Sequence, residues 1–166
     1  MNILDNGDRR VFSSGAVRDI DDSKGRVDLM PIKVIGDMLN DPVLIHIGEY
    51  VYDGDIKHLE RAIREFSRTR YESLWDALLD VSVHYRDGSL KYAERNWEKG
   101  INLHSYIDSG CRHYLKVRRG DLDEPHDRAF LWNMLGAIWT QENRPECIDL
   151  PFARKENNNE GINTIR

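Results

Sequence analysis

The chain has 166 residues, which is enough for one domain with a buried core and short for two. Its apolar fraction of 40% and charged fraction of 32% are typical of a soluble globular protein. A net charge of −5 argues against general nucleic-acid binding, which usually requires a basic surface. The first residues lack an apolar signal core, and no apolar run approaches membrane-spanning length, so we expect a cytoplasmic protein without membrane contacts.

Residues 1–30 are predicted to form a partly irregular N-terminal arm, because glycines interrupt a polar run in which basic residues alternate with aspartates. Such a composition is typical of an arm exposed to solvent. The alternative is a segment that folds over a site or a neighbouring subunit, where Arg18 or Arg26 would bind phosphate.

Residues 31–70 are predicted to be helical with short turns between the helices. Pro31 opens one helix, and Asp55 is placed to cap another. Between them, Asp41-Pro42 repeats the start signal, although the frequent Val, Ile and Tyr residues there also suit a strand. The three segments are 32–39, about 42–51, and 56–70.

A longer helix is predicted over residues 71–93. The apolar side expected to face the core consists of Leu74, Leu78, Val81, Tyr85 and Tyr92. A second stripe is polar, as a face exposed to solvent usually is, and its members are Asp76, Asp80, His84, Asp87 and Lys91. Gly88 costs about 1 kcal/mol inside a helix, which indicates close approach by another backbone or a ligand, or else an exposed weak point.

A loop over residues 95–103 is predicted to carry groups that recognise a ligand. The helix after it is predicted over 106–119. Ser105 and Asp108 have the spacing of a capping box at its start, and Gly120 suits a left-handed residue at its end.

The last long helix is expected to begin with Asp123 as its cap. It is apolar nearly all round from Ala129 to Trp139, so we expect it to be central and buried. Three polar residues interrupt it at intervals of seven: His126, Asn133 and Thr140.

No segment is convincing as a β-strand, so the predicted fold class is all-α, an antiparallel helical bundle. We expect a single helical domain over residues 31–142. The arm of residues 1–30 precedes it, and a polar, flexible C-terminal tail over residues 143–166 follows it.

Acidic residues on two of the predicted helices would converge if those helices pack face to face. Asp80, His84 and Asp87 lie on one helix, and Glu124 and Asp127 lie on the other. Mg²⁺ prefers carboxylate oxygens together with water and phosphate oxygens, so these residues are candidate metal ligands. The simpler interpretation is that acids at a helix N-terminus complement the helix dipole.

The His126-Asp127 dipeptide suggests a weaker alternative. Metal-dependent phosphohydrolases of the HD type use a His, a His-Asp pair and a further Asp as ligands. His104 or His113 would supply the first of these and Asp149 the last.

Basic and aromatic side chains alternate between residues 91 and 112. Such a mixture suits a nucleotide, because the rings stack on the base and the cations bind the phosphates. Ordinary packing of Trp97 beneath a loop is the alternative. The residues are Lys91, Tyr92, Arg95, Trp97, Lys99 and Arg112.

A long motif covers residues 84–101. It reads His84-Tyr-x-x-Gly-x-x-Lys-Tyr-x-x-Arg-Asn-Trp-Glu-Lys-Gly-Ile101. Shorter pieces accompany it: Phe12-Ser-Ser-Gly-Ala16, Gly25-Arg-Val-Asp-Leu-Met-Pro31, Asp108-Ser, Arg112-His113, Asp123-Glu-x-His126 and Trp132-Asn133. Together they resemble the phage-associated dATP/dGTP diphosphohydrolase family. The resemblance covers roughly residues 9–142, and residues 40–71 look inserted relative to shorter relatives.

The resemblance implies an all-α, MazG-like nucleotide pyrophosphohydrolase. Such an enzyme cleaves a nucleoside triphosphate to the monophosphate and pyrophosphate, with Mg²⁺, or Mn²⁺ in its place, held by carboxylates on facing helices. It further implies a homodimer or homotetramer and, for a phage protein, the host cytoplasm. The metal ligands expected on this basis are Asp80, His84, Asp87, Glu124 and Asp127, of which Asp87, Glu124 and Asp127 are the expected catalytic residues. The expected substrate-binding residues are Lys91, Tyr92, Arg95, Asn96, Trp97, Lys99, Arg112, His113, His126 and Asn133.

Two departures from the family pattern keep a second function open. His84-x-x-Asp87 stands where the MazG-like pattern has Glu-x-x-Glu, and Pro125 stands where many relatives have an Asp. The alternative is a phage protein that binds and sequesters a nucleotide, or a nucleotide-derived signal, without hydrolysing it.

Overall fold

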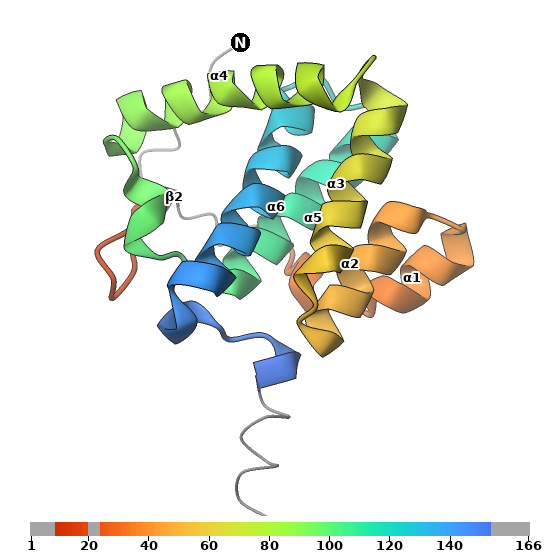
Figure 1. Cartoon of the computed structure of the whole chain (residues 1–166), viewed down its shortest axis with the longest axis horizontal. Coiled ribbons are helices and arrows are strands. Elements are labelled where there is room, and N and C mark those ends of the chain that lie inside the picture. The colour runs from red at the N-terminus through yellow and green to blue at the C-terminus, as the bar shows by residue number, and fades with distance from the viewer. Residues whose placement is uncertain (1–8, 20–23, 154–166) are drawn as a thin grey trace, which may run out of the picture.

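The computed structural model describes residues 9–19 and 24–153 and consists mainly of helices (Figure 1). The α-helices in these ranges are α1 (Ile32–Leu39), α2 (Pro42–Asp53), α3 (Ile56–Arg70), α4 (Leu74–Tyr92), α5 (Leu103–Arg119) and α6 (His126–Asn143). Short 3-10 helices lie at Val27–Leu29 (η1), Asn96–Lys99 (η2) and Pro145–Cys147 (η3). The all-α prediction is confirmed. The prediction of a flexible tail from residue 143 is wrong for its described part, where η3 follows α6 and Leu150 and Phe152 are buried in the core. The rest of the predicted tail lies outside the described residues.

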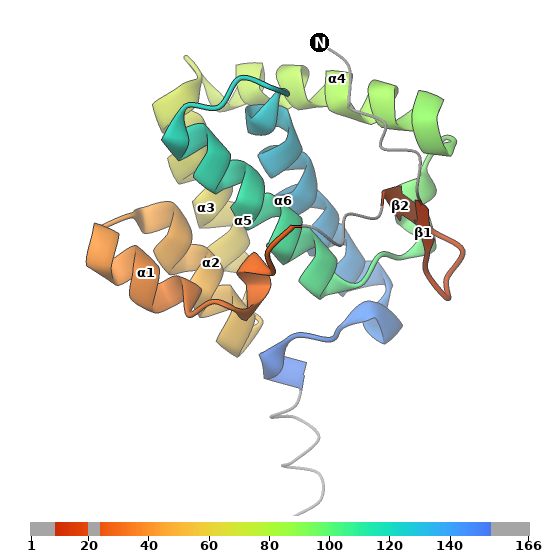
Figure 2. The same ribbon diagram turned by 180° about the vertical axis from the view of Figure 1, so that it is seen from behind.

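Helix α6 forms the centre of the bundle, as predicted. It packs along α5 and also contacts α3 and α4, while α1 and α2 form a pair beside α3 (Figure 2). Helix α4 crosses one end of the bundle (Figure 1). Within the described part of the chain, no helix is long and apolar enough to cross a membrane.

Glycines allow α5 and α6 to approach closely. A Cβ atom on Gly110 of α5 would lie 2.4 Å from Met134 Cε, and one on Gly136 of α6 would lie 2.5 Å from Tyr106 Cε1. Tyr106 and Met134 are fully buried. Side chains therefore fill the space between the two helices at van der Waals contact. The polar residues His126, Asn133 and Thr140 of α6 are buried as well.

Helix starts are partly as predicted. Asp41 caps α2 by accepting hydrogen bonds from Val43 N and Leu44 N, which settles that segment as a helix, and Asp55 caps α3. The capping box at Ser105 was a wrong prediction, because α5 already begins at residue 103 with Asn102 at the cap position. The side chain of Asp108 instead accepts a hydrogen bond from Val27 N at 2.6 Å.

The expected cap of the last helix was also wrong. Helix α6 begins at His126, with Pro125 at the cap position and no side-chain cap. Asp123 instead accepts hydrogen bonds from the side chains of His126 and Lys116.

Helix α4 faces the bundle differently from the prediction. Leu74 and Leu78, expected inside, are 36% and 38% exposed. Much of the polar stripe points toward the protein, because its side chains find partners there. Asp80 binds Arg128 of α6, and His84 packs against Trp132 of the same helix.

The described part of the N-terminal arm folds over the bundle, as the alternative to an arm exposed to solvent predicted, although β1 itself is exposed. Strands β1 (Arg9–Val11) and β2 (Val17–Asp19) pair antiparallel with Arg10 opposite Arg18, which also corrects the expectation of no strands. Phe12 and Ala16, in the turn between the strands, are buried.

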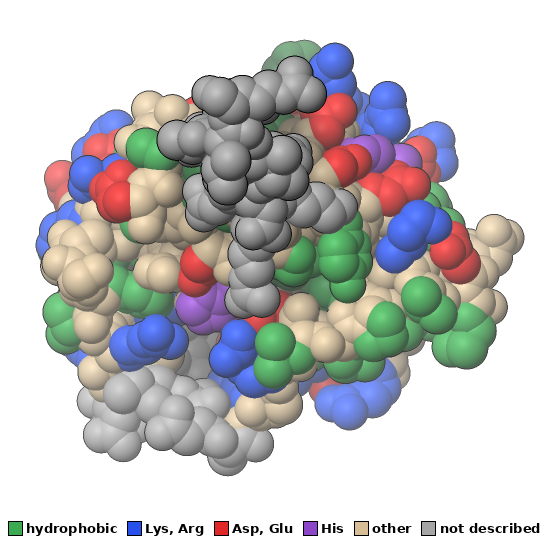
Figure 3. All heavy atoms as spheres, turned by 90° about the horizontal axis from the view of Figure 1, so that it is seen from below, with side chains coloured by type: hydrophobic (Ala, Val, Ile, Leu, Met, Phe, Trp, Pro, Cys, Tyr) green, Lys and Arg blue, Asp and Glu red, His purple; other side chains and the backbone are tan. Residues whose placement is uncertain are grey.

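Charges of both signs mix on the molecular surface. Figure 3 shows basic and acidic side chains interspersed over the face seen from below, wherever side chains are coloured by type. This face has no large area of a single sign among those side chains.

Candidate functional site

A cavity of about 800 Å³ lies between the arm, α4, α5 and the first half of α6. Its volume is in the range of small-molecule sites. Lys and Arg outnumber Asp and Glu in its lining, although the chain as a whole is acidic, so the cavity suits an anion. The basic lining residues are Arg10, Arg18, Lys24, Arg26, Arg112 and Lys116, and the acidic ones are Asp19, Asp108, Asp123 and Glu124.

Arg18 extends from β2 into this cavity. Its guanidinium donates hydrogen bonds to Asn133 Oδ1 at 2.6 Å and to Ser105 O at 3.1 Å. It also lies 5.6 Å from the ring centroids of Tyr106 and Trp132. Burial lowers the pKa of Arg18. No carboxylate of the described residues forms an ion pair with this guanidinium, so a partly buried positive charge remains without an acidic partner.

Asn96 and Lys91 hold the β-ribbon in place. The Asn96 side chain accepts a hydrogen bond from Val17 N at 3.0 Å and donates one to Val17 O at 2.8 Å. Lys91 Nζ lies 2.5 Å from Asp19 Oδ2. Both residues were predicted to bind substrate, and both contact the segment that carries Arg18.

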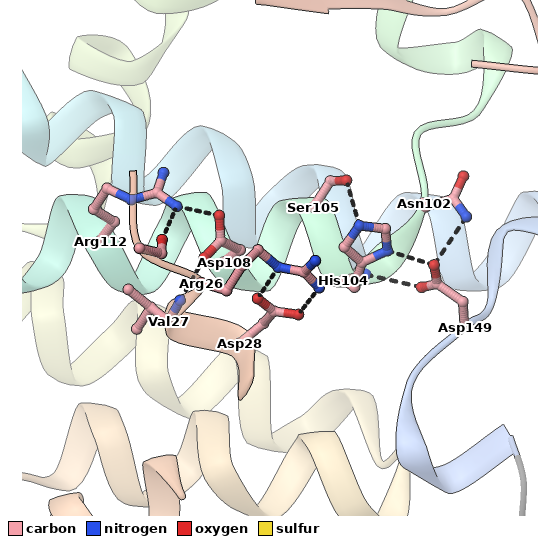
Figure 4. A network of polar contacts seen from close by, with 10 residues as sticks. Arg26, Val27, Asp28, Asn102, His104, Ser105, Asp108, Arg112 and Asp149 are labelled. Carbon is pink, nitrogen blue, oxygen red and sulfur yellow. Dashed lines mark hydrogen bonds and ion pairs between the residues drawn. The ribbon is translucent and has the colours of Figure 1, made fainter. Parts of the chain in front are cut away.

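The second half of the arm is held against α5 (Figure 4). Asp108 accepts a hydrogen bond from Val27 N and forms an ion pair with Arg112, which also donates to Gly25 O at 3.0 Å. Arg112, a predicted substrate-binding residue, thus lines the cavity while it fixes the arm.

His84 lies on the α4 side of the cavity. Its Nδ1 atom is buried and has no hydrogen-bond partner among the described residues, and burial lowers its pKa to about 4. The ring is therefore neutral at pH 7 and lies 5.8 Å from the Trp132 ring. Gly88, one turn further along α4, faces open space in the same lining, so the predicted approach of another backbone is wrong.

Two histidines and two acids form a cluster where α5 meets the start of α6. His113 Nδ1 lies 2.9 Å from His126 Nδ1, and His126 Nε2 lies 2.7 Å from Asp123 Oδ1. Glu124 Oε1 lies 3.6 Å from His113 Nδ1 and 3.4 Å from His126 Nδ1. Burial, followed by the neighbouring His126, lowers the pKa of His113 well below its usual range. The hydrogen bond from His126, followed by that from Lys116, lowers the pKa of Asp123.

The acids predicted to join Glu124 lie elsewhere. Asp80 binds Arg128 at 2.7 Å and Tyr71 at 3.0 Å. Asp87 pairs with Arg86, and Asp127 pairs with Arg70 through two bonds of 3.0 and 3.1 Å. None of the three belongs to a group of three or more potential metal ligands in the described ranges. The five predicted ligands therefore do not come together, and a Mg²⁺ site made of this set does not fit the arrangement.

Of the residues predicted to bind a ligand between positions 92 and 99, some line the cavity and others pack or pair elsewhere. Tyr92 and Asn96 line the cavity. Trp97 packs edge-on against Trp139 at 4.9 Å, which matches the alternative of ordinary packing. Arg95 forms an ion pair with Glu98, and Lys99 lines a separate hollow of about 260 Å³.

The HD-type ligand set does not assemble either. His113 and His126 do meet, but Asp149 binds the ring of His104, and Asp127 is bound to Arg70. His104 and His113 are separated by more than two turns of α5.

Lys116 and Asp123 were missed as site residues. A signal was present, since Lys116 follows His113 by three residues and so shares its helical face. Arg18 had been considered only as a phosphate contact of the arm, because its partners Asn133 and Ser105 are distant in the sequence.

Fold and cavity together define an all-α protein with an internal site suited to a small anionic molecule. The family model for the N-terminal part of dATP/dGTP diphosphohydrolases matches residues 61–149, more than half of the chain, and the protein belongs to this family. The family indicates a hydrolase of the diphosphohydrolase type. Together with the histidine and carboxylate groups it also indicates a divalent metal ion. Comparison with curated proteins gives no match, and neither does comparison with solved structures.

Proposed function

We propose that the protein hydrolyses dATP or dGTP in the cavity to the deoxynucleoside monophosphate and pyrophosphate, with a divalent metal ion. The observation that carries the proposal is the cavity itself. It is lined both by Arg18, which has no acidic partner among the described residues, and by Glu124 with His113 beside it. One part suits phosphate binding, and the other suits acid–base chemistry.

The phosphates would lie between Arg18 and Lys116. Arg18 supplies a charge that no acid of the described residues neutralises, and Lys116 Nζ lies 3.8 Å from Glu124 Oε1. The base would lie toward α4, where His84 lines the cavity and Trp132 and Tyr92 offer ring faces. Lys91 and Asn96 would act through the arm that they hold.

Hydrolysis requires a water molecule to attack the α-phosphorus while the bond to the bridging oxygen of the β-phosphate breaks. Glu124 is the carboxylate that we assign to accept the proton of that water, because it lines the cavity and is 18% exposed. A metal ion bound in the cavity would stabilise the charge of the leaving pyrophosphate.

The test is turnover of each dNTP and NTP with Mg²⁺ or Mn²⁺, with the products separated by chromatography. We expect monophosphate and pyrophosphate from the purine deoxynucleotides, and loss of both products in Glu124→Gln. The matched control is Glu98→Gln, a carboxylate outside the cavity lining, which should leave turnover unchanged. Release of inorganic triphosphate, or full activity in Glu124→Gln, would contradict the proposal.

A second candidate function is sequestration of a nucleotide without hydrolysis. The ion pairs that Asp80, Asp87 and Asp127 form favour it, because these acids are engaged with arginines and do not gather at the cavity. Retention of a nucleotide at 1:1 stoichiometry, with no product in any metal, would support this function over the first.

A further inference from the structure

Three atoms of the histidine cluster have the separations of metal ligands. His113 Nδ1, His126 Nδ1 and Glu124 Oε1 form a triangle with sides of 2.9, 3.4 and 3.6 Å. The point equidistant from them lies about 1.9 Å from each, just inside the usual bond lengths of roughly 2.0–2.2 Å from zinc to nitrogen and oxygen. An ion slightly above the plane of the triangle would thus contact all three atoms without any movement of the helices.

The hydrogen bond to Asp123 orients His126 as a ligand. Because a carboxylate oxygen lies 2.7 Å from His126 Nε2, that nitrogen carries the proton, and the lone pair of Nδ1 points into the triangle. Histidine ligands of metals commonly donate their other N–H to a carboxylate in this way. The anionic Glu124 Oε1 faces the same lone pair at 3.4 Å, an arrangement that a cation between them would stabilise.

The cluster is closed on one side and open on the other. The His126 side chain is 2% exposed, whereas His113 and Glu124 are 16% and 18% exposed and line the cavity. Three protein ligands with free positions toward a cavity are typical of catalytic metal sites, while structural sites use four. The carboxylates of Asp123 and Glu124 lie within 3.6 Å of one or both imidazoles, and Lys116 pairs with these carboxylates at 3.0 and 3.8 Å.

We propose that His113, His126 and Glu124 bind one first-row transition-metal ion, of the Zn²⁺ class in preference to Mg²⁺, with its free positions directed into the cavity. Imidazole nitrogen suits such ions, whereas Mg²⁺ prefers an all-oxygen environment. The role of the ion, which is to contact the phosphates of a bound nucleotide, rests on the proposed function. Metal binding itself can be measured without nucleotide.

Two other groups of potential ligands have to be separated from this one. Asp121, Asp123 and His126 form the first, which does not contain His113, so the variant His113→Gln leaves it intact. His46, Glu49 and His58 form the second, lie close together on α2 and α3 and do not line the cavity. Replacement of His46 by Gln disables that group and leaves the cavity intact. All measurements are therefore made in a His46→Gln background.

The experiment titrates Co²⁺, Zn²⁺ and Mg²⁺ into the full chain, with calorimetry for affinity and visible absorption for Co²⁺. We expect one Co²⁺ or Zn²⁺ per chain and no displacement of Co²⁺ by equimolar Mg²⁺. His113→Gln should weaken binding more than 10-fold and abolish the Co²⁺ bands. Asp123→Asn should weaken binding about 10- to 100-fold, as loss of such a hydrogen-bonding partner does.

Glu124→Gln serves as a second ligand variant if His113→Gln fails to fold by circular dichroism. Unchanged affinity in a folded ligand variant, or equal binding of Mg²⁺, would overturn the metal proposal. Tight Zn²⁺ binding without nucleotide turnover would contradict only the proposed hydrolysis. Turnover with Mg²⁺ that is equal in the wild type and in His113→Gln would contradict only the metal proposal.

Discussion

Arg18 is a partly buried cation whose hydrogen bonds go to neutral groups, Asn133 Oδ1 and Ser105 O. A buried charge is costly unless a group of opposite sign compensates it. An anionic ligand in the cavity supplies that compensation. The binding energy of a phosphate should therefore depend strongly on this one side chain.

We expect Arg18→Gln to weaken nucleotide binding by at least 10-fold, because a charge-assisted bond in a buried site is lost. Arg95→Gln is the matched control, since Arg95 is paired with Glu98 outside the cavity. Calorimetric titration with a non-hydrolysable nucleotide measures both. Equal affinities in the two variants would remove Arg18 from the site.

His84 should make stability depend on pH. Its pKa is about 4 in the folded protein, against an ordinary value of 6.5 for a histidine in an unfolded chain, so the unfolded chain binds the proton more readily. The stability it contributes is present in full above pH 6.5 and is lost as the pH falls toward 4. His113, whose pKa is also lowered, acts in the same direction.

Urea unfolding at several pH values between 7 and 4 tests this. His84→Gln should show a shallower loss of unfolding free energy over that range than the wild type. His46→Gln, a histidine outside the cavity, should follow the wild type. A His84→Gln curve parallel to the wild type would contradict the assignment.

At the scale of elements, glycines in two helices have opposite roles. Gly136 of α6 sits against the buried ring of Tyr106, while Gly88 of α4 faces open space. Gly136→Ala should lower the unfolding free energy by about 1–3 kcal/mol, because a rigid aromatic ring must move. Gly88→Ala should raise it by roughly 0.5–1 kcal/mol, because a helix interior prefers Ala. Chemical denaturation distinguishes the two, and equal effects would contradict the assigned packing.

The helices themselves were predictable because their signals are local. Asp41 and Asp55 each cap the helix that begins at the next residue, and the apolar composition of α6 predicted its burial. The orientation of α4 was not predictable, since it depends on partners such as Arg128 that only the fold supplies. The residues of the candidate site were likewise predictable one by one, but not as a group. Glu124 and His126 were singled out, but their meeting with His113 depends on how α5 packs against α6.

At the scale of the whole molecule, the outer face of α4 carries large apolar side chains. Trp75 and Leu79 are 75% and 71% exposed, and they lie on one side of the helix with Leu78. Contiguous exposed apolar residues often mark an interface. We expect a dimer or tetramer that buries this face.

Sedimentation velocity tests the expectation. Leu79→Glu should shift the wild-type oligomer to a monomer, because a charge would be buried at the contact. Leu122→Glu is the matched control, as Leu122 is equally apolar and 84% exposed but lies outside α4. A wild type that sediments as a monomer would exclude the oligomer.

Two separate stretches of the chain supply the lining of the cavity, and the N-terminal arm is one of them. Arg10, Arg18, Lys24 and Arg26 come from before residue 31, whereas the matched family region of residues 61–149 supplies the imidazoles and Glu124. Four of the six cations in the lining thus come from a different stretch of chain than the histidines and Glu124, while Arg112 and Lys116 lie on α5 within the matched region. Exchange of the segment before α1 should change which anion the cavity prefers while the chemistry at its other end stays the same.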